Sequence, residues 1–149
     1  MEHASVDIYG QPSWKMENSS TELYVTERGG QIAPVTFFAD SDQPVRPYYV
    51  APWAEEQKEA DPPVLGPLRG DFFCMPFGAD NRYHGENHTV HGETASADWR
   101  YESHTRTGAV TTLTLSLETT ERPGTIRKNI SLVDGHNVVY QSHRISGFT

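Results

Sequence analysis

The residues best suited to chemistry lie close together near the middle of the chain, in residues 69–99. Three of the seven histidines, His84, His88 and His91, fall here among arginines, carboxylates, glycines and aromatic residues. Imidazole and carboxylate groups can bind metals, hold hydroxyl groups by hydrogen bonds and transfer protons near neutral pH. This central stretch is therefore where we expect a functional site.

A metal site is one interpretation of these histidines. Together with Glu86 and Glu93, the side chains of His84, His88 and His91 offer the nitrogen and oxygen ligands that zinc and iron accept. The glycines and asparagine between them disfavour a helix that would align the imidazoles, and the spacing differs from the His-x-His pair of cupins. A small cupin-like metalloprotein that uses His84, His88 and His91 stays an alternative, whereas the main prediction includes no metal and no other cofactor.

Carbohydrate binding is the second interpretation. Sugars present flat apolar faces, which aromatic rings cover, and hydroxyl groups, which polar side chains hold in fixed directions. The central stretch combines both kinds of residue: Asn81, Arg82, Tyr83, His91, Asp98 and Trp99. Two alternatives without chemistry remain, namely a loop that only covers the core and an interaction module whose aromatic loop, residues 48–77, faces a partner.

Length and composition limit the classes of protein to which this chain can belong. The 149 residues suit a single β-sandwich domain over residues 1–149. A net charge of −8 argues against binding to nucleic acid or to an anionic membrane. The single cysteine, Cys74, excludes an intramolecular disulfide. Neither a signal peptide nor a membrane span is recognisable in the sequence, so a cytoplasmic location is expected.

The elements that must position the central stretch are predicted to be β-strands. Before it, short strands are expected at residues 13–17, 23–25, 31–38 and 45–50, and Pro34 indicates an edge or a bulge in the third of them. Residues 51–70 contain four prolines, which indicates a long loop with at most a helical turn.

The last third of the sequence has the clearest pattern. Leu113, Leu115 and Leu117 alternate with polar residues, as in a strand with one buried face. With strands also expected at residues 99–105, 126–132 and 138–145, this part predicts an antiparallel meander. The fold class is therefore all-β, an antiparallel β-sandwich. The last strand is expected to leave an open sheet edge, which a second subunit of a homo-oligomer would cover.

Several short motifs occur in the order found in one known family. Pro76-Phe77-Gly78, Asn81-Arg82, His91-Gly92 and Trp99 resemble the core of the galactose mutarotase-like proteins, which include the aldose 1-epimerases. Residues 29–35 are similar to the early glycine-led strand of that family, and residues 125–130 to its central meander. The resemblance covers most of residues 20–147 and corresponds to the N-terminal half of such a protein.

This resemblance implies a supersandwich fold with a groove for a monosaccharide or a related sugar. It implies that Arg82 and His91 contact the sugar, with Asn81 and Trp99 beside them. Aldose 1-epimerases open the sugar ring with a glutamate as general base and a second histidine as general acid. Both residues follow the meander in the family, and His143 lies before the corresponding position, so the catalytic residues are not assigned. The expectation is a protein that binds a sugar without the catalytic pair of an epimerase.

Overall fold

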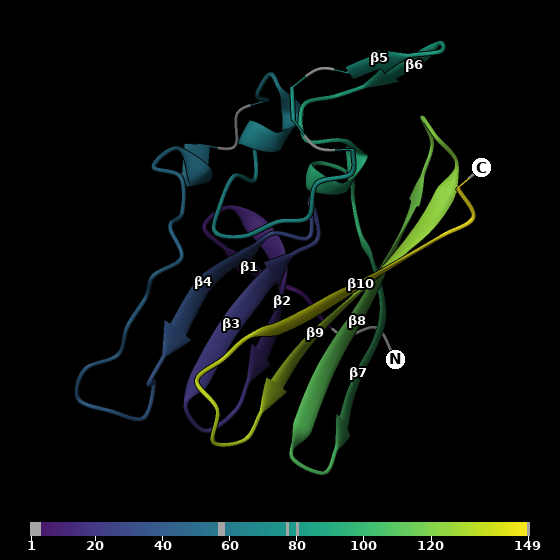
Figure 1. Ribbon diagram of the computed structural model, residues 1–149. Helices are drawn as coiled ribbons and strands as arrows, with labels where there is room; N and C mark the ends of the chain where they lie inside the picture. The colour runs from purple at the N-terminus through teal and green to yellow at the C-terminus, as the bar shows by residue number, and fades with distance from the viewer. Residues whose placement is uncertain (1–3, 57–58, 77, 80, 149) are drawn as a thin grey trace.

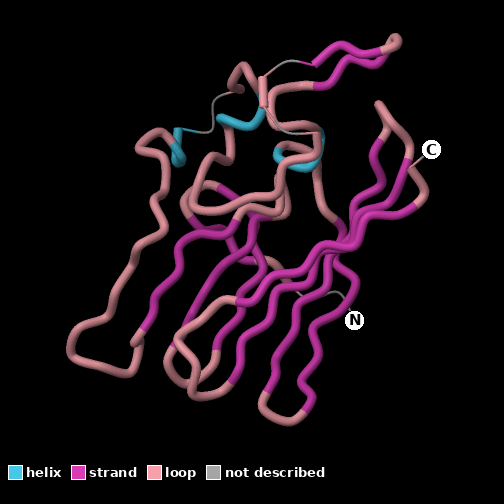
Figure 2. Tube along the Cα trace, viewed as in Figure 1, coloured by secondary structure: helices cyan, strands magenta, loops and turns pink. Residues whose placement is uncertain are grey.

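Antiparallel β-strands are the main regular structure of the molecule, whose computed structural model describes residues 4–56, 59–76, 78–79 and 81–148 (Figures 1 and 2). The first sheet has the order β1-β2-β3-β4. Its strands are β1 (Val6–Ile8), β2 (Gln11–Glu17), β3 (Thr21–Thr26) and β4 (Ile32–Phe37). The register between β3 and β4 shifts between Leu23 and Val25, and β4 is an edge strand, so both interpretations of Pro34 are confirmed. β1 forms a hairpin with β2.

The second sheet is the predicted meander, in the order β10-β9-β8-β7. Its strands are β7 (Arg100–Thr107), β8 (Val110–Thr119), β9 (Gly124–Val133) and β10 (Tyr140–Ser146). β10 lies at the edge of the sheet, as expected for the last strand. The prediction of an all-β fold is confirmed.

The two sheets pack face to face around one core, which makes the molecule a sandwich. The inward faces of β8 and β9 are the ones that the alternating pattern predicts, because Leu113, Leu115 and Ile126 are fully buried. The core joins these side chains to apolar residues of the first sheet. Its buried members are Trp14, Met16, Leu23, Val25, Ile32, Val35, Trp99, Leu113, Leu115, Leu117, Ile126, Ile130 and Leu132.

The segment between the sheets, residues 38–99, lies mainly beside and beyond one end of the sandwich (Figure 1). Its described part contains three short 3-10 helices, η1 (Ala54–Glu56), η2 (Pro63–Leu65) and η3 (Glu93–Ala95). It also contains a small hairpin of β5 (Asn81–Tyr83) and β6 (Glu86–His88).

The prediction of a strand at residues 45–50 is wrong. Only Val45 and Val50 form isolated bridges, because prolines at 44 and 47 remove backbone donors on either side of the expected start.

Buried polar side chains attach this long segment to the sandwich. Gln31 accepts a hydrogen bond from the backbone of Arg69 (2.8 Å) and donates to Ala95 (3.1 Å). The guanidinium of Arg69, a residue only 2% exposed, donates to the carbonyls of Pro67, Ile8 and Tyr9. These bonds satisfy groups that would otherwise be buried without partners, so they fix the segment that carries the candidate site.

None of the helices in the described ranges combines the length and the apolar character needed to cross a membrane.

Candidate functional site

An open cleft of about 460 Å³ lies where the β5–β6 hairpin meets the turn between β8 and β9. One wall is apolar and is formed by Met75, Pro76, Ile145 and Phe148, with the ring of Tyr83 beside them. The other wall is polar. It contains Glu86, His88, Glu93, Thr119 and Arg122. The cleft therefore combines a broad apolar surface with a few directed polar groups, as ligand sites commonly do.

The apolar wall is positioned by a close crossing of two segments. The hydroxyl of Thr94 donates to the carbonyl of Phe73 (2.7 Å) and accepts from the backbone N–H of Met75 (2.9 Å). Gly92 lies at the same crossing. Its φ is +74°, and a Cβ atom at this position would be 2.1 Å from the carbonyl oxygen of Met75. Glycine at this position is therefore required for both its conformation and the available space.

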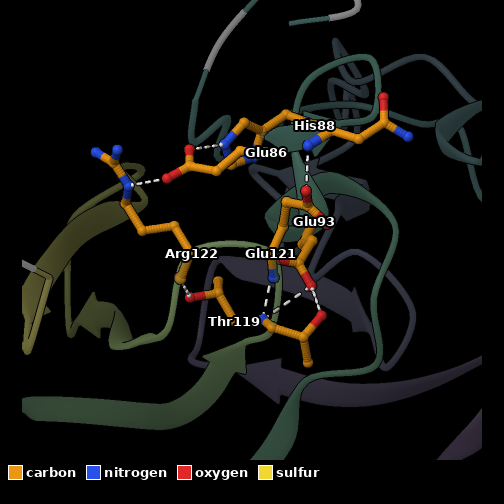
Figure 3. A network of polar contacts seen from close by, with 8 residues as sticks. Glu86, His88, Glu93, Thr119, Glu121 and Arg122 are labelled. Atoms are coloured by element: carbon orange, nitrogen blue, oxygen red, sulfur yellow. Dashed lines mark hydrogen bonds and ion pairs between the residues drawn. The ribbon is translucent and has the colours of Figure 1, made fainter. Parts of the chain in front are cut away.

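The polar wall is organised around the carboxylate of Glu86 (Figure 3). One carboxylate oxygen lies 2.6 Å from Nε2 of His88, and the other accepts a hydrogen bond from Nε of Arg122 at 2.7 Å. These two hydrogen bonds, first that of His88 and then that of Arg122, hold the pKa of Glu86 below its ordinary value. Glu86 is therefore charged at neutral pH and aligns both of its neighbours.

Arg122 keeps donors available for a ligand. Its side chain is 42% exposed, and its Nε is the atom engaged by Glu86. In Figure 3 the two terminal nitrogens point away from Glu86 and from the other residues drawn. His88, in contrast, is buried, and its Nδ1 atom has no hydrogen-bond partner within the described ranges. Arg122 is therefore the polar residue of the cleft best placed to donate to a bound molecule.

Glu93 anchors the turn that carries Arg122. Its carboxylate accepts hydrogen bonds from the backbone N–H of Thr120 (3.0 Å), the hydroxyl of Thr120 (2.5 Å) and the backbone N–H of Glu121 (3.0 Å). The backbone N–H of Asn87 donates to the carboxylate of Glu121, which links the turn to the hairpin as well. Because Glu93 is occupied in this way, its role in the cleft is to position the turn.

Replacing Glu93 by glutamine tests this role. The amide offers one acceptor oxygen where the carboxylate offers two, and it carries no charge, so we expect the free energy of unfolding to fall by about 1–3 kcal/mol. Chemical denaturation of the wild type and of Glu93→Gln measures the difference. A matched control is Glu118→Gln, because Glu118 is an exposed carboxylate on the neighbouring strand β8. Equal effects of the two substitutions would contradict the anchoring role.

Of the four residues predicted to bind a sugar, Arg82, His91 and Trp99 have described side chains, and these lie in different surroundings. Arg82 is exposed on β5, next to the cleft, and the backbone of Asn81 pairs with His88 while its side chain lies outside the described part. His91 is half-buried, with Nδ1 3.5 Å from Sγ of Cys74. Trp99 is 3% exposed and donates from Nε1 to the carbonyl of Thr94 (3.0 Å), so it belongs to the core. Of the Pro76-Phe77-Gly78 motif, Phe77 lies outside the described residues.

The histidines considered for a metal site face different neighbours. His84 stacks on Tyr83, with ring centroids 4.1 Å apart, whereas His88 binds Glu86 and His91 contacts Cys74. Among the residues that the structure describes, no group of three or more His, Cys, Asp or Glu side chains is arranged to hold a metal ion.

Cys74 is half-buried. Burial, followed by the charge of the nearby Asp71, raises the pKa of its thiol, which therefore stays protonated at neutral pH.

His143, the histidine closest to the expected catalytic position, lies on β10 outside the cleft lining. Its ring stacks on Phe73 with centroids 4.0 Å apart. Burial, followed by the charge of Lys128, lowers the pKa of His143 to about 4. The imidazole is therefore neutral at physiological pH.

No family model, curated protein or solved structure matches the chain. The resemblance to galactose mutarotase-like proteins therefore rests on the short motifs alone, and the function has to be argued from the cleft. Sequence reasoning missed the cleft residues that follow the central stretch, namely Thr119, Arg122, Ile145 and Phe148. Arg122 lies between two expected strands, and nothing in its local sequence indicates that Glu86 is its partner.

Proposed function

We propose that the protein binds carbohydrate, and that the cleft between the β5–β6 hairpin and the β8–β9 turn is its binding site. The observation that carries this proposal is the Glu86–Arg122 pair, with 2.7 Å between Oε1 and Nε, beside an apolar wall. A hydroxyl group both donates and accepts, so a sugar can donate to the carboxylate while it accepts from the guanidinium. The apolar face of the same ring would pack against Tyr83 and the wall formed by Met75 and Phe148.

The charge of the cleft favours a neutral sugar. Glu86 and Glu93 contribute two negative charges to its lining, and Arg122 contributes one positive charge. The protein as a whole carries a net charge of −8. An anionic ligand would therefore be repelled, whereas the hydroxyls of a neutral aldose can use both partners.

Binding is proposed here without epimerisation. Ring opening requires a base at the anomeric hydroxyl and an acid at the ring oxygen. Glu86 is a weak base because its pKa is lowered, and Arg122 is a poor acid because guanidinium keeps its proton. The cleft residues are therefore suited to holding a sugar.

Isothermal titration with a panel of neutral aldoses tests the proposal. We expect at least one aldose to bind the wild type, and Arg122→Met to lower its affinity at least about tenfold, since a charge-assisted hydrogen bond is lost. Arg127→Met is the matched control, because Arg127 is exposed and alternates with the buried residues of β9. The same titration with His91→Ala tests the sugar contact that the family resemblance implies. Failure of every aldose to bind, or equal affinity of wild type and Arg122→Met, would overturn the assignment.

A further inference from the structure

A second, shallower depression of about 440 Å³ continues from the cleft onto the β5–β6 hairpin. It is lined by Arg82, Tyr83, His84, Gly85, Glu86 and Asn87. Tyr83 and Glu86 belong to both hollows, so the two are adjacent and share one boundary. A molecule that extends out of the cleft past Tyr83 therefore enters the depression.

Two stacked rings form an aromatic surface in this depression. Tyr83 is 59% exposed, and its ring lies 4.1 Å from that of His84 at an interplanar angle of 23°. The hairpin turn holds this pair in place, because His84 and Gly85 both have positive φ, +48° and +92°. Two successive residues with positive φ are typical of the tight turns that join paired strands. The surface therefore exists before any ligand arrives.

Polar groups flank the aromatic pair. Arg82 is exposed on β5, and its guanidinium makes no hydrogen bond or ion pair with the side chains that the structure describes. Asn87 lies opposite Arg82 in the hairpin register and is exposed as well. The depression thus repeats the chemistry of the cleft, an apolar ring surface beside donors and acceptors for hydroxyl groups.

We propose that the β5–β6 hairpin provides a second sugar subsite, so that the ligand of the cleft is an oligosaccharide of at least two units. This inference rests on the proposed function, because it requires a first sugar in the cleft. One sugar ring occupies the cleft beside Tyr83, and the next ring of the same chain packs on the face of His84 that is turned away from Tyr83, with its hydroxyls towards Arg82. A free monosaccharide uses only the first of these positions.

The test compares each aldose of the panel with disaccharides built from it, in isothermal titrations of the whole chain. We expect at least one disaccharide to bind about fivefold more tightly than its monosaccharide, which corresponds to one additional ring stacked on an aromatic surface. His84→Ala is expected to remove this gain and to leave monosaccharide affinity unchanged, because His84 lies outside the lining of the cleft. Arg82→Gln is expected to lower the affinity for the disaccharide.

The outcomes separate this inference from the proposed function. If an aldose binds and no disaccharide binds more tightly, the second subsite is refuted and the carbohydrate site in the cleft stands. If His84→Ala retains the full gain, the second ring does not lie on the hairpin and the assignment is refuted as well. If neither aldoses nor disaccharides bind, the proposed function itself fails. Circular dichroism of each variant verifies that it is folded.

Discussion

Trp99→Ala is expected to lower the free energy of unfolding by about 3–5 kcal/mol, the usual cost of removing a large buried aromatic side chain. The indole is 3% exposed and packs in the core between the two sheets. Its Nε1 donates to the carbonyl of Thr94, so the substitution also leaves that carbonyl without its donor. Gly30 approaches the ring so closely that a Cβ atom there would be 3.0 Å from Nε1. Chemical denaturation measures the loss.

Tyr83→Ala is the matched aromatic control. Tyr83 is 59% exposed, so its removal should change the free energy of unfolding by about 0.5 kcal/mol or less. In the sugar titration the order should reverse, with Tyr83→Ala lowering the affinity and a folded Trp99→Phe variant keeping it. A stable Trp99→Ala protein that had lost sugar affinity would instead place Trp99 at the ligand, as the family resemblance implies.

A second large effect is expected in the pH dependence of stability, and it originates from Lys128. This lysine lies on the buried face of β9 with its Nζ 2.6 Å from the carbonyl oxygen of Gly30 and 5.8 Å from the centre of the Trp99 ring. Burial lowers the pKa of Lys128 to about 8, whereas in the unfolded chain the lysine pKa has its ordinary value of 10.5. The folded state therefore binds fewer protons than the unfolded state between these two values, so stability rises with pH across this window.

The rise should amount to about 3 kcal/mol between pH 7 and pH 10.5 from this residue alone. Lys128→Met removes the ionisable group from the core, so its free energy of unfolding should lack the rise and, at pH 7, equal or exceed that of the wild type. Denaturation curves of both proteins from pH 7 to pH 10 measure the difference. Lys15→Met serves as control, because Lys15 is paired with Glu17 and Glu22 at the surface. Parallel curves for wild type and Lys128→Met would refute a buried, destabilised charge.

Alternation in the sequence predicted the second sheet well, because its strands have one buried and one exposed face. Leu113, Leu115 and Leu117 are buried as expected, and so is Ile126. The pattern did not predict that Lys128 is buried, although this residue lies on the same face of β9 as Ile126 and Ile130. A lysine in that phase normally places its amine in water. Here the amine finds an acceptor 98 residues away in the chain, and no local pattern contains that information.

The sequence predicted where the candidate site lies, but it did not predict all of the residues that line it. The central stretch does form one side of the cleft, through Tyr83, Glu86, His88 and Glu93. The rest of the lining, however, comes from the end of β8, the turn that follows it, the end of β10 and Phe148. Which turn of a meander lies against which distant loop depends on how the two sheets stack, and alternation within one strand does not determine this. Arg122 was therefore out of reach of sequence reasoning.

The hairpin formed by β5 and β6 contributes Tyr83, Glu86 and His88 to the cleft and little to the core of the sandwich. Among the described strands, the two pair only with each other, and of the side chains of residues 82–88 that of His88 is the one that is buried. Under the proposed function, ligand preference is therefore encoded largely by residues that do not build the core. Exchanging residues 82–84 by design should alter the preferred sugar without disturbing the packing of the sandwich.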